Sequence, residues 1–128
     1  MSDTQLRASV VVAVYNEAEN VAAVCNEILE GMAPAAPFEI VWVDDGSSDD
    51  TANILQAIAE RDPRVRVLRH DRRCAKSQAV RTGVIGARAP WIATLDGDGQ
   101  NDPTDLPDML QQAWAAEGRA PLVAGIRV

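Results

Sequence analysis

The stretch Phe38–Leu55, FEIVWVDDGSSDDTANIL, decides the fold, because an apolar run gives way to acidic residues and then to a helical pattern. Phe38–Val43 is rich in apolar and β-branched residues, as is typical of a strand. Asp44–Asp50 is a polar turn, in which Ser48 or Asp49 is placed to cap the following helix. The stretch therefore predicts a strand–turn–helix unit of an α/β sheet.

The same alternation continues outward in both directions along the chain. Further runs typical of strands are Ser9–Val14, Val65–Leu68, Trp91–Leu95 and Leu122–Ala124. Apolar residues at helical spacing occur in Val21–Leu29, Ile54–Ile58, Ala79–Ala87 and Leu106–Ala113. The sequence thus predicts an α/β fold, a doubly wound and mostly parallel sheet with helices on both faces, in a single domain that spans residues 1–128.

The composition predicts a soluble domain that does not bind nucleic acid. The chain is 47% apolar and has a formal charge of -7, and its one basic cluster, Arg69–Lys76, is too short and interrupted for a phosphate backbone. Cys25 and Cys74 lack metal-site spacing and make a poor disulfide framework, so we expect a reducing compartment. Met1–Arg7 is polar and lacks the apolar core expected of a signal peptide, and no apolar run is long enough to span a bilayer.

Polar residues follow the first two strands, at the end of a parallel sheet where ligands usually bind. Tyr15-Asn16-Glu17 could stack on a base and hold a ribose, although an ordinary helix cap is the commoner role for such residues. Asp44 and Asp45 repel each other and lose hydration at a strand end, so packing alone does not account for the pair. One such carboxylate can accept an N–H group of uracil or guanine.

The sharpest motif is LDGDGQNDP at residues 95–103. Its glycines let the backbone bend so that Asp96 and Asp98 face one point, and oxygen ligands of this kind suit Mg2+ or Mn2+. Because the motif offers few protein charges, a substrate diphosphate is expected to complete the coordination. An EF-hand is excluded, because its sixth and twelfth residues would be Asn101 and Pro107. A phosphatase with an Asp-x-Asp nucleophile would carry the motif on its first strand.

Residues after the third strand give a weaker signal. Arg72, Arg73 and Lys76 could contact a diphosphate, but a solvated loop explains them equally well. His70 is the only histidine, and a surface or packing role is favoured for it over that of a base.

Three segments of the chain resemble the motifs of glycosyltransferase family 2, which has the GT-A fold. They occur in the same order as in the family: Val10–Glu17, Val43–Thr51 and Leu95–Pro103. The Asp-Gly-Asp-x-Gln form, followed by Asn-Asp-Pro, is most similar to the polyprenyl-phosphate branch. That branch includes dolichol-phosphate mannosyltransferase and bacterial undecaprenyl-phosphate glycosyltransferases.

The resemblance implies roles for particular residues. It implies a nucleotide site made of Ala13, Tyr15, Glu17, Asp44, Asp45, Lys76, Asp96 and Gly97. It implies that Asp96, Asp98 and Gln100 hold Mg2+ or Mn2+, with Asp98 as the catalytic residue. The chain departs from the family in having Ala13 where proline is usual, and Cys74-Ala75-Lys76 where a Gly-Lys-Gly loop is usual.

The implied reaction transfers a sugar, with inversion, from a UDP- or GDP-sugar to a polyprenyl phosphate. The protein would be cytoplasmic and peripheral at the inner face of the membrane, and an apolar edge of the sheet would favour a homodimer. Family members continue beyond the position of Val128, so the chain resembles a truncated member. The alternative is a catalytically silent remnant that binds a nucleotide; a nucleotidyltransferase is disfavoured, because no Gly-rich loop with an arginine follows the first strand.

Overall fold

A computed structural model describes residues 6–96 and 123–125, in which five parallel strands form one sheet in the order β3-β2-β1-β4-β5. The strands are β1 (Ala8–Val14), β2 (Phe38–Asp44), β3 (Val65–Arg69), β4 (Trp91–Asp96) and β5 (Val123–Gly125). The helices are α1 (Val21–Gly31), α2 (Thr51–Arg61) and α3 (Lys76–Gly86), with a short 3-10 turn η1 (Ala33–Ala35). The predicted doubly wound sheet is confirmed, while the helix expected at 106–113 lies outside the described residues.

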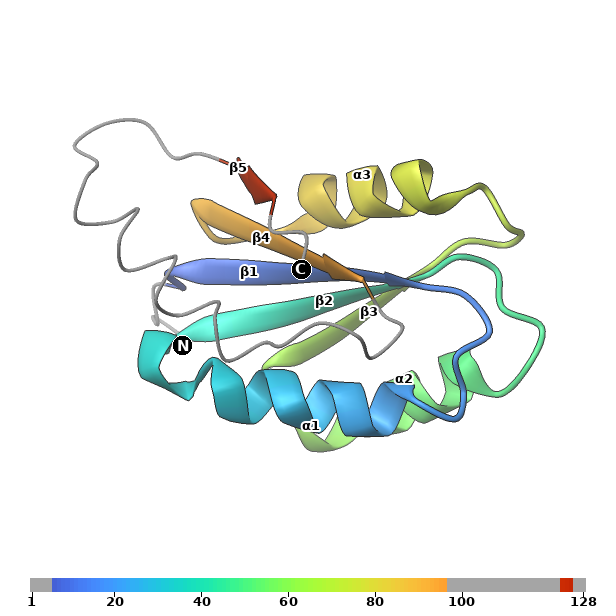
Figure 1. Cartoon of the computed structure of the whole chain (residues 1–128), viewed down its shortest axis with the longest axis horizontal. Coiled ribbons are helices and arrows are strands. Elements are labelled where there is room, and N and C mark those ends of the chain that lie inside the picture. The colour runs from blue at the N-terminus through green and yellow to red at the C-terminus, as the bar shows by residue number, and fades with distance from the viewer. Residues whose placement is uncertain (1–5, 97–122, 126–128) are drawn as a thin grey trace.

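Helices cover both faces of the sheet (Figure 1): α1 and α2 lie on one face and α3 on the other. Alternate residues of β1 supply the two cores, as the two-residue period of a strand requires. Val10 and Val12 belong to the larger core with α1 and α2, whereas Val11 belongs to the smaller core with Ala79 of α3. Every residue of β1 and β2 is buried, which explains why both strands consist mainly of apolar residues.

Glu39, one of the two charged residues of these strands together with Asp44 at the end of β2, is paired within the fold. Its carboxylate accepts hydrogen bonds from Ser9 Oγ at 2.6 Å, Arg66 Nε at 2.9 Å and the Arg88 backbone N–H at 2.8 Å. A buried carboxylate without partners would be strongly destabilising. The network therefore makes Glu39 compatible with the core and ties the start of β2 to β3 and to the loop that leads into β4.

Among the described residues, no helix is both long enough and apolar enough to cross a bilayer. The elements begin and end close to the predicted limits. For example, β3 was expected at Val65–Leu68 and extends one residue further, to Arg69.

The close approach of α3 to the sheet depends on Gly83, a residue without a side chain. A Cβ at this position would overlap Val11 Cγ1 and lie 3.1 Å from Val43 Cγ2, both of which belong to buried valines. At Gly86, one turn closer to the helix end, a Cβ would meet only Leu68 Cδ1, the tip of a flexible side chain. The small residues at Ala79 and Gly83 therefore set the spacing between helix and sheet.

We expect Gly83→Ala to lower the free energy of unfolding by about 1–3 kcal/mol, because overpacking outweighs the gain in helix propensity. Gly86→Ala is the matched control, and its stability should be unchanged or raised. Urea denaturation of the three proteins measures the difference. Equal stabilities for the two variants would show that α3 can move away from β1 at little cost.

Candidate functional site

The carboxyl ends of the four long strands meet at one edge of the sheet. Val14 of β1 lies beside Asp44 of β2, which lies beside Arg69 of β3, and Ala13 lies beside Asp96 of β4. The helices change face between β1 and β4, because β2 and β3 lie on one side of β1 and β4 on the other. In open α/β sheets, ligands bind beyond the strand ends at such a switch point.

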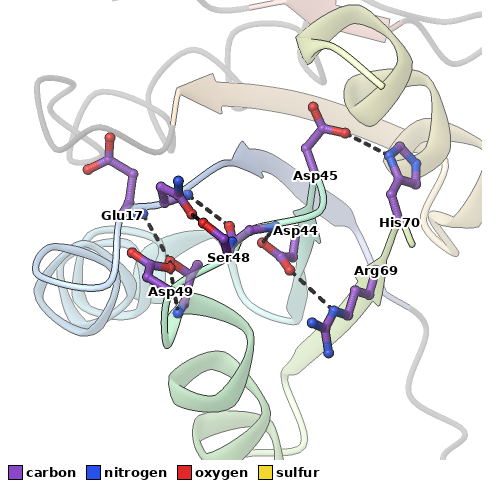
Figure 2. A network of polar contacts seen from close by, with 10 residues as sticks. Glu17, Asp44, Asp45, Ser48, Asp49, Arg69 and His70 are labelled. Carbon is purple, nitrogen blue, oxygen red and sulfur yellow. Dashed lines mark hydrogen bonds and ion pairs between the residues drawn. The ribbon is translucent and has the colours of Figure 1, made fainter. Parts of the chain in front are cut away.

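Asp45, directly after β2, is a buried carboxylate of this edge with three hydrogen-bond partners. Oδ1 lies 2.9 Å from His70 Nδ1 and accepts the Cys74 N–H at 2.8 Å, and Oδ2 accepts the Ala75 N–H at 3.0 Å. Figure 2 shows Asp45 and His70 pointing toward each other from neighbouring segments. The residue is 3% exposed, and these donors compensate for the lost hydration. One acceptor position on Oδ2 remains for a ligand.

The same contacts keep Asp45 ionised. Burial acts to raise its pKa, but the hydrogen bonds from the Cys74 N–H, His70 and the Ala75 N–H prevail and hold the pKa below its usual value of 3.8. Near neutral pH the side chain is therefore an acceptor of hydrogen bonds, as recognition of an N–H group on a base requires.

Asp44 has a different environment from Asp45. It is 0% exposed; Oδ1 accepts the Ser47 N–H at 3.3 Å, and Oδ2 lies 3.5 Å from Arg69 Nε. Oδ2 has no hydrogen-bond partner among the described residues. In this conformation Asp44 is enclosed by the protein, so its expected contact with a nucleotide stays a prediction.

The loops after β1 and β2 are joined by Asn16. Its N–H donates to Ser47 Oγ at 2.8 Å, and its Oδ1 accepts the Ser48 N–H at 2.8 Å. Asn16 has φ 53°, a left-handed conformation that asparagine tolerates better than most residues. Both loops are therefore held in fixed relative positions beside the switch point.

Asp49 and Thr51 make a second link between the same loops. Figure 2 shows Glu17 and Asp49, which lie at this link. The Glu17 N–H donates to Thr51 Oγ1 at 2.9 Å, and Asp49 accepts the N–H groups of Thr51 at 3.0 Å and Ala18 at 3.3 Å. The Thr51 hydroxyl and N–H lower the pKa of Asp49. Although Asp50 occupies the N-cap position of α2, Asp49 supplies the side-chain acceptor that was expected of Ser48 or Asp49.

Other residues predicted for the nucleotide site surround this edge. Glu17 Oε1 accepts a hydrogen bond from Asn20 Nδ2 at 2.7 Å. The Arg73 guanidinium lies over the Tyr15 ring, 4.1 Å from its centroid. Lys76 is the exposed first residue of α3, whereas Ala13 is buried in the core beneath that helix. Tyr15 and Arg73 thus bring an aromatic ring and a cation together.

The loop between β3 and α3 lies against the turn after β2. Gly46 has φ 76°, and a Cβ there would overlap the backbone of Arg72 and Arg73. Ala75 has φ 94° and ψ 155°, in a region that is almost restricted to glycine. Its N–H is bound by Asp45, so the carboxylate helps to hold a strained conformation.

Of the proposed metal motif, the structure describes only the backbone of the first aspartate, Asp96. The Asp96 backbone ends β4 beside Ala13, at the same edge as Asp45. The Asp96 side chain and residues Gly97, Asp98 and Gln100 lie outside what the structure describes.

The structure brings together residues that the sequence did not connect. His70 was expected at the surface or in packing, and Cys74 was judged unsuited to a metal; the His70 ring and the Cys74 backbone N–H both contact Asp45. Ligand atoms of Asp45, His70 and Cys74 lie within 4.8 Å of one another. Their sequence spacing shows no metal motif, and only the position of His70 directly after a strand could have indicated this arrangement.

The family model of glycosyl transferase family 2 matches residues 9–125. An undecaprenyl-phosphate 4-deoxy-4-formamido-L-arabinose transferase of Pseudomonas fluorescens is 40% identical over an alignment of 112 residues that covers 82% of this chain and 32% of that protein. A dodecaprenyl-phosphate galacturonate synthase of Rhizobium johnstonii is 33% identical over 109 residues, 84% of this chain and 32% of that protein. The chain spans about a third of the length of the curated relatives it matches.

Solved structures share the fold. The mannosyltransferase PcManGT of Pyrobaculum calidifontis, in complex with GDP-Man and Mn2+, has a TM-score of 0.74 at 26% identity, covering 90% of this chain and 34% of that one. TarS of S. aureus, in complex with UDP-GlcNAc, has a TM-score of 0.73 at 21% identity, covering 86% of this chain and 32% of that one. The TarS likeness supports the fold alone.

Glycine at position 75 should relieve the backbone strain. We expect Ala75→Gly to raise the free energy of unfolding by about 0.5–2 kcal/mol, since the strained conformation costs more than the added freedom of the unfolded chain. Ala87, which has φ -69°, provides the matched control. Ala87→Gly should lower stability by about 0.4–1 kcal/mol. Denaturant unfolding measures both, and a loss of stability in both variants would contradict strain at Ala75.

The lowered pKa of Asp45 makes stability depend on pH. Its contribution is fully present above the unfolded value of 3.8 and is lost as the pH falls through the lower folded pKa. We expect the free energy of unfolding to fall in this acidic range, and to fall less steeply in Asp45→Asn. Asp71→Asn removes an exposed neighbouring carboxylate and serves as the control. If the free energy of unfolding fell equally with pH in the parent and in Asp45→Asn, the lowered pKa of Asp45 would be contradicted.

Proposed function

The chain belongs to glycosyl transferase family 2 and has the GT-A fold, and on that premise we propose that it forms the donor site of a glycosyltransferase. The proposed reaction transfers a sugar from a UDP- or GDP-sugar to a polyprenyl phosphate. The observation that best supports it is the meeting of Tyr15, Asp45 and the end of β4 at the switch point. The polyprenyl-phosphate enzymes among the relatives support the choice of acceptor.

In this proposal the nucleoside lies between the loops that follow β1 and β2. The remaining acceptor position on Asp45 Oδ2 would take an N–H group of the base, and the Tyr15 ring would contact the base or the ribose. Glu17 would face the ribose hydroxyl groups. The links through Asn16 and Thr51 hold these loops together before the ligand arrives, so less conformational freedom is lost on binding.

The diphosphate would lie toward the end of β4 and the start of α3. Arg73 and Lys76 would contribute positive charge there. Asp96, Asp98 and Gln100 would hold Mg2+ or Mn2+, and Gly97 would let the backbone approach the nucleotide. The Mn2+ in the PcManGT complex is consistent with such an ion. When bound, the metal would act as a Lewis acid on the diphosphate leaving group.

A phosphate acceptor is already anionic, so it needs little help from a general base. Attack on the anomeric carbon from the face opposite the diphosphate would invert its configuration. Asp98 is proposed as the catalytic residue through its position in the metal motif. We place the protein in the cytoplasm, peripheral to the inner face of the membrane, where a polyprenyl phosphate would be reached. The single-domain organisation over residues 1–128 and a homodimer remain proposals.

Calorimetric titration of UDP and GDP, with and without Mn2+, tests the donor site. We expect metal-dependent binding, weakened at least about tenfold by Asp96→Ala and by Asp45→Asn, which corresponds to about 1.4 kcal/mol. Asp71→Asn removes an exposed carboxylate outside these contacts, so this variant should bind the nucleotide as the parent does. Thermal melting confirms that each variant is folded.

Failure of the folded parent to bind either nucleotide would overturn the proposal. Binding without transfer of a labelled sugar to a polyprenyl phosphate would instead support the alternative of a catalytically silent nucleotide-binding protein.

A further inference from the structure

Asp45, His70 and Cys74 bring a carboxylate oxygen, an imidazole nitrogen and a thiol sulfur within 4.8 Å of one another. We propose that these three side chains bind a Zn2+ ion, at a site distinct from the Asp96 motif. Mixed oxygen, nitrogen and sulfur ligands suit Zn2+, whereas Mg2+ and Mn2+ favour oxygen. The ligands come from the end of β2, the end of β3 and the loop before α3, so tertiary structure creates the site.

The three ligand atoms can reach tetrahedral spacing around a zinc ion through small movements. Zinc lies about 2.0–2.3 Å from such ligands, which places neighbouring ligand atoms roughly 3.3–3.8 Å apart. His70 Nδ1 and Asp45 Oδ1 are 2.9 Å apart, so they need to separate only slightly. Cys74 lies in an exposed loop, and a shift of about 1 Å brings its sulfur into range. Backbone N–H groups of Cys74 and Ala75 already fix the Asp45 carboxylate.

Thr82 fixes the histidine in the form that binds metal through Nδ1. His70 Nε2 lies 2.8 Å from Thr82 Oγ1, and Thr82 donates its own hydroxyl proton to the Gln78 carbonyl oxygen at 3.0 Å. Thr82 can therefore only accept from His70, so Nε2 carries a proton and Nδ1 faces Asp45. An outer hydrogen bond of this kind orients the histidine of many metal sites.

On binding, zinc would take the place of the hydrogen bond between His70 Nδ1 and Asp45 Oδ1 and of the thiol proton of Cys74. The protons displaced from these ligands would pass to solvent. Three protein ligands leave a fourth position for water. Because Asp45 is shared, a bound zinc ion would also compete with a nucleobase; only this consequence depends on the proposed function.

Metal titration of the reduced full chain tests the site without any nucleotide. Zinc affinity is measured by competition with a chromophoric chelator, and Co2+ is used as a spectroscopic substitute. We expect one ion per chain, with strong tetrahedral cobalt bands and a thiolate-to-cobalt charge-transfer band. Cys74→Ser and His70→Gln should each weaken zinc binding at least about tenfold and remove the charge-transfer band. Asp71→Asn and Asp96→Ala should retain both the affinity and the band.

Cys74→Ser is the decisive variant, because the side chain is exposed and its backbone N–H to Asp45 remains. Melting without metal checks that it folds like the parent. A charge-transfer band that persists in Cys74→Ser would assign the thiolate to Cys25, which is buried in α1, and would overturn the proposal. Zinc affinity equal to that of the parent in this variant, or zinc binding that Asp96→Ala abolishes, would overturn it as well.

Discussion

Helices cover both faces of the sheet, so its charged residues can be accommodated only where hydrogen-bond donors reach the strands. Glu39 meets this condition near the start of β2 and Asp45 meets it just beyond the end. Asp44 meets it only in part, because one of its buried oxygens lacks a hydrogen bond among the described residues. The cost of burying charge therefore explains why polar side chains gather at the strand ends, where a ligand can reach them.

The edge used for the proposed function is held together by two sets of contacts. Asn16 and Thr51 join the loops after β1 and β2, and Asp45 joins the turn after β2 to the loop after β3. A carboxylate that accepts three hydrogen bonds has a fixed orientation and a fixed charge. Such a group favours binding because little has to be reorganised when a ligand arrives. The same bonds also make Ala75 adopt a conformation that suits glycine better.

The sequence was sufficient to predict the strands, the three helices within the described residues and the placement of Asp45 at the sheet edge, because each rests on local pattern. Continuous apolar runs identify buried strands, and acidic residues after them must lie at strand ends. The partners of Asp45 could not be predicted in this way. His70 approaches it only because β3 pairs with β2 in one register, and nothing in the identity of Ala75 indicates its backbone angles. Side-chain pairing between loops depends on tertiary structure that no local pattern encodes.

The contacts that join the loops connect residues far apart in the chain, from 25 positions between Asp45 and His70 to 34 between Glu17 and Thr51. Closing segments of this length loses chain entropy before the hydrogen bonds can form. Each strand–helix unit can therefore collapse early on its own apolar residues. The hydrogen bonds of the polar edge form only after three such units have packed together. We expect the ability to hold a ligand to be acquired in the last step of folding rather than with the strands themselves.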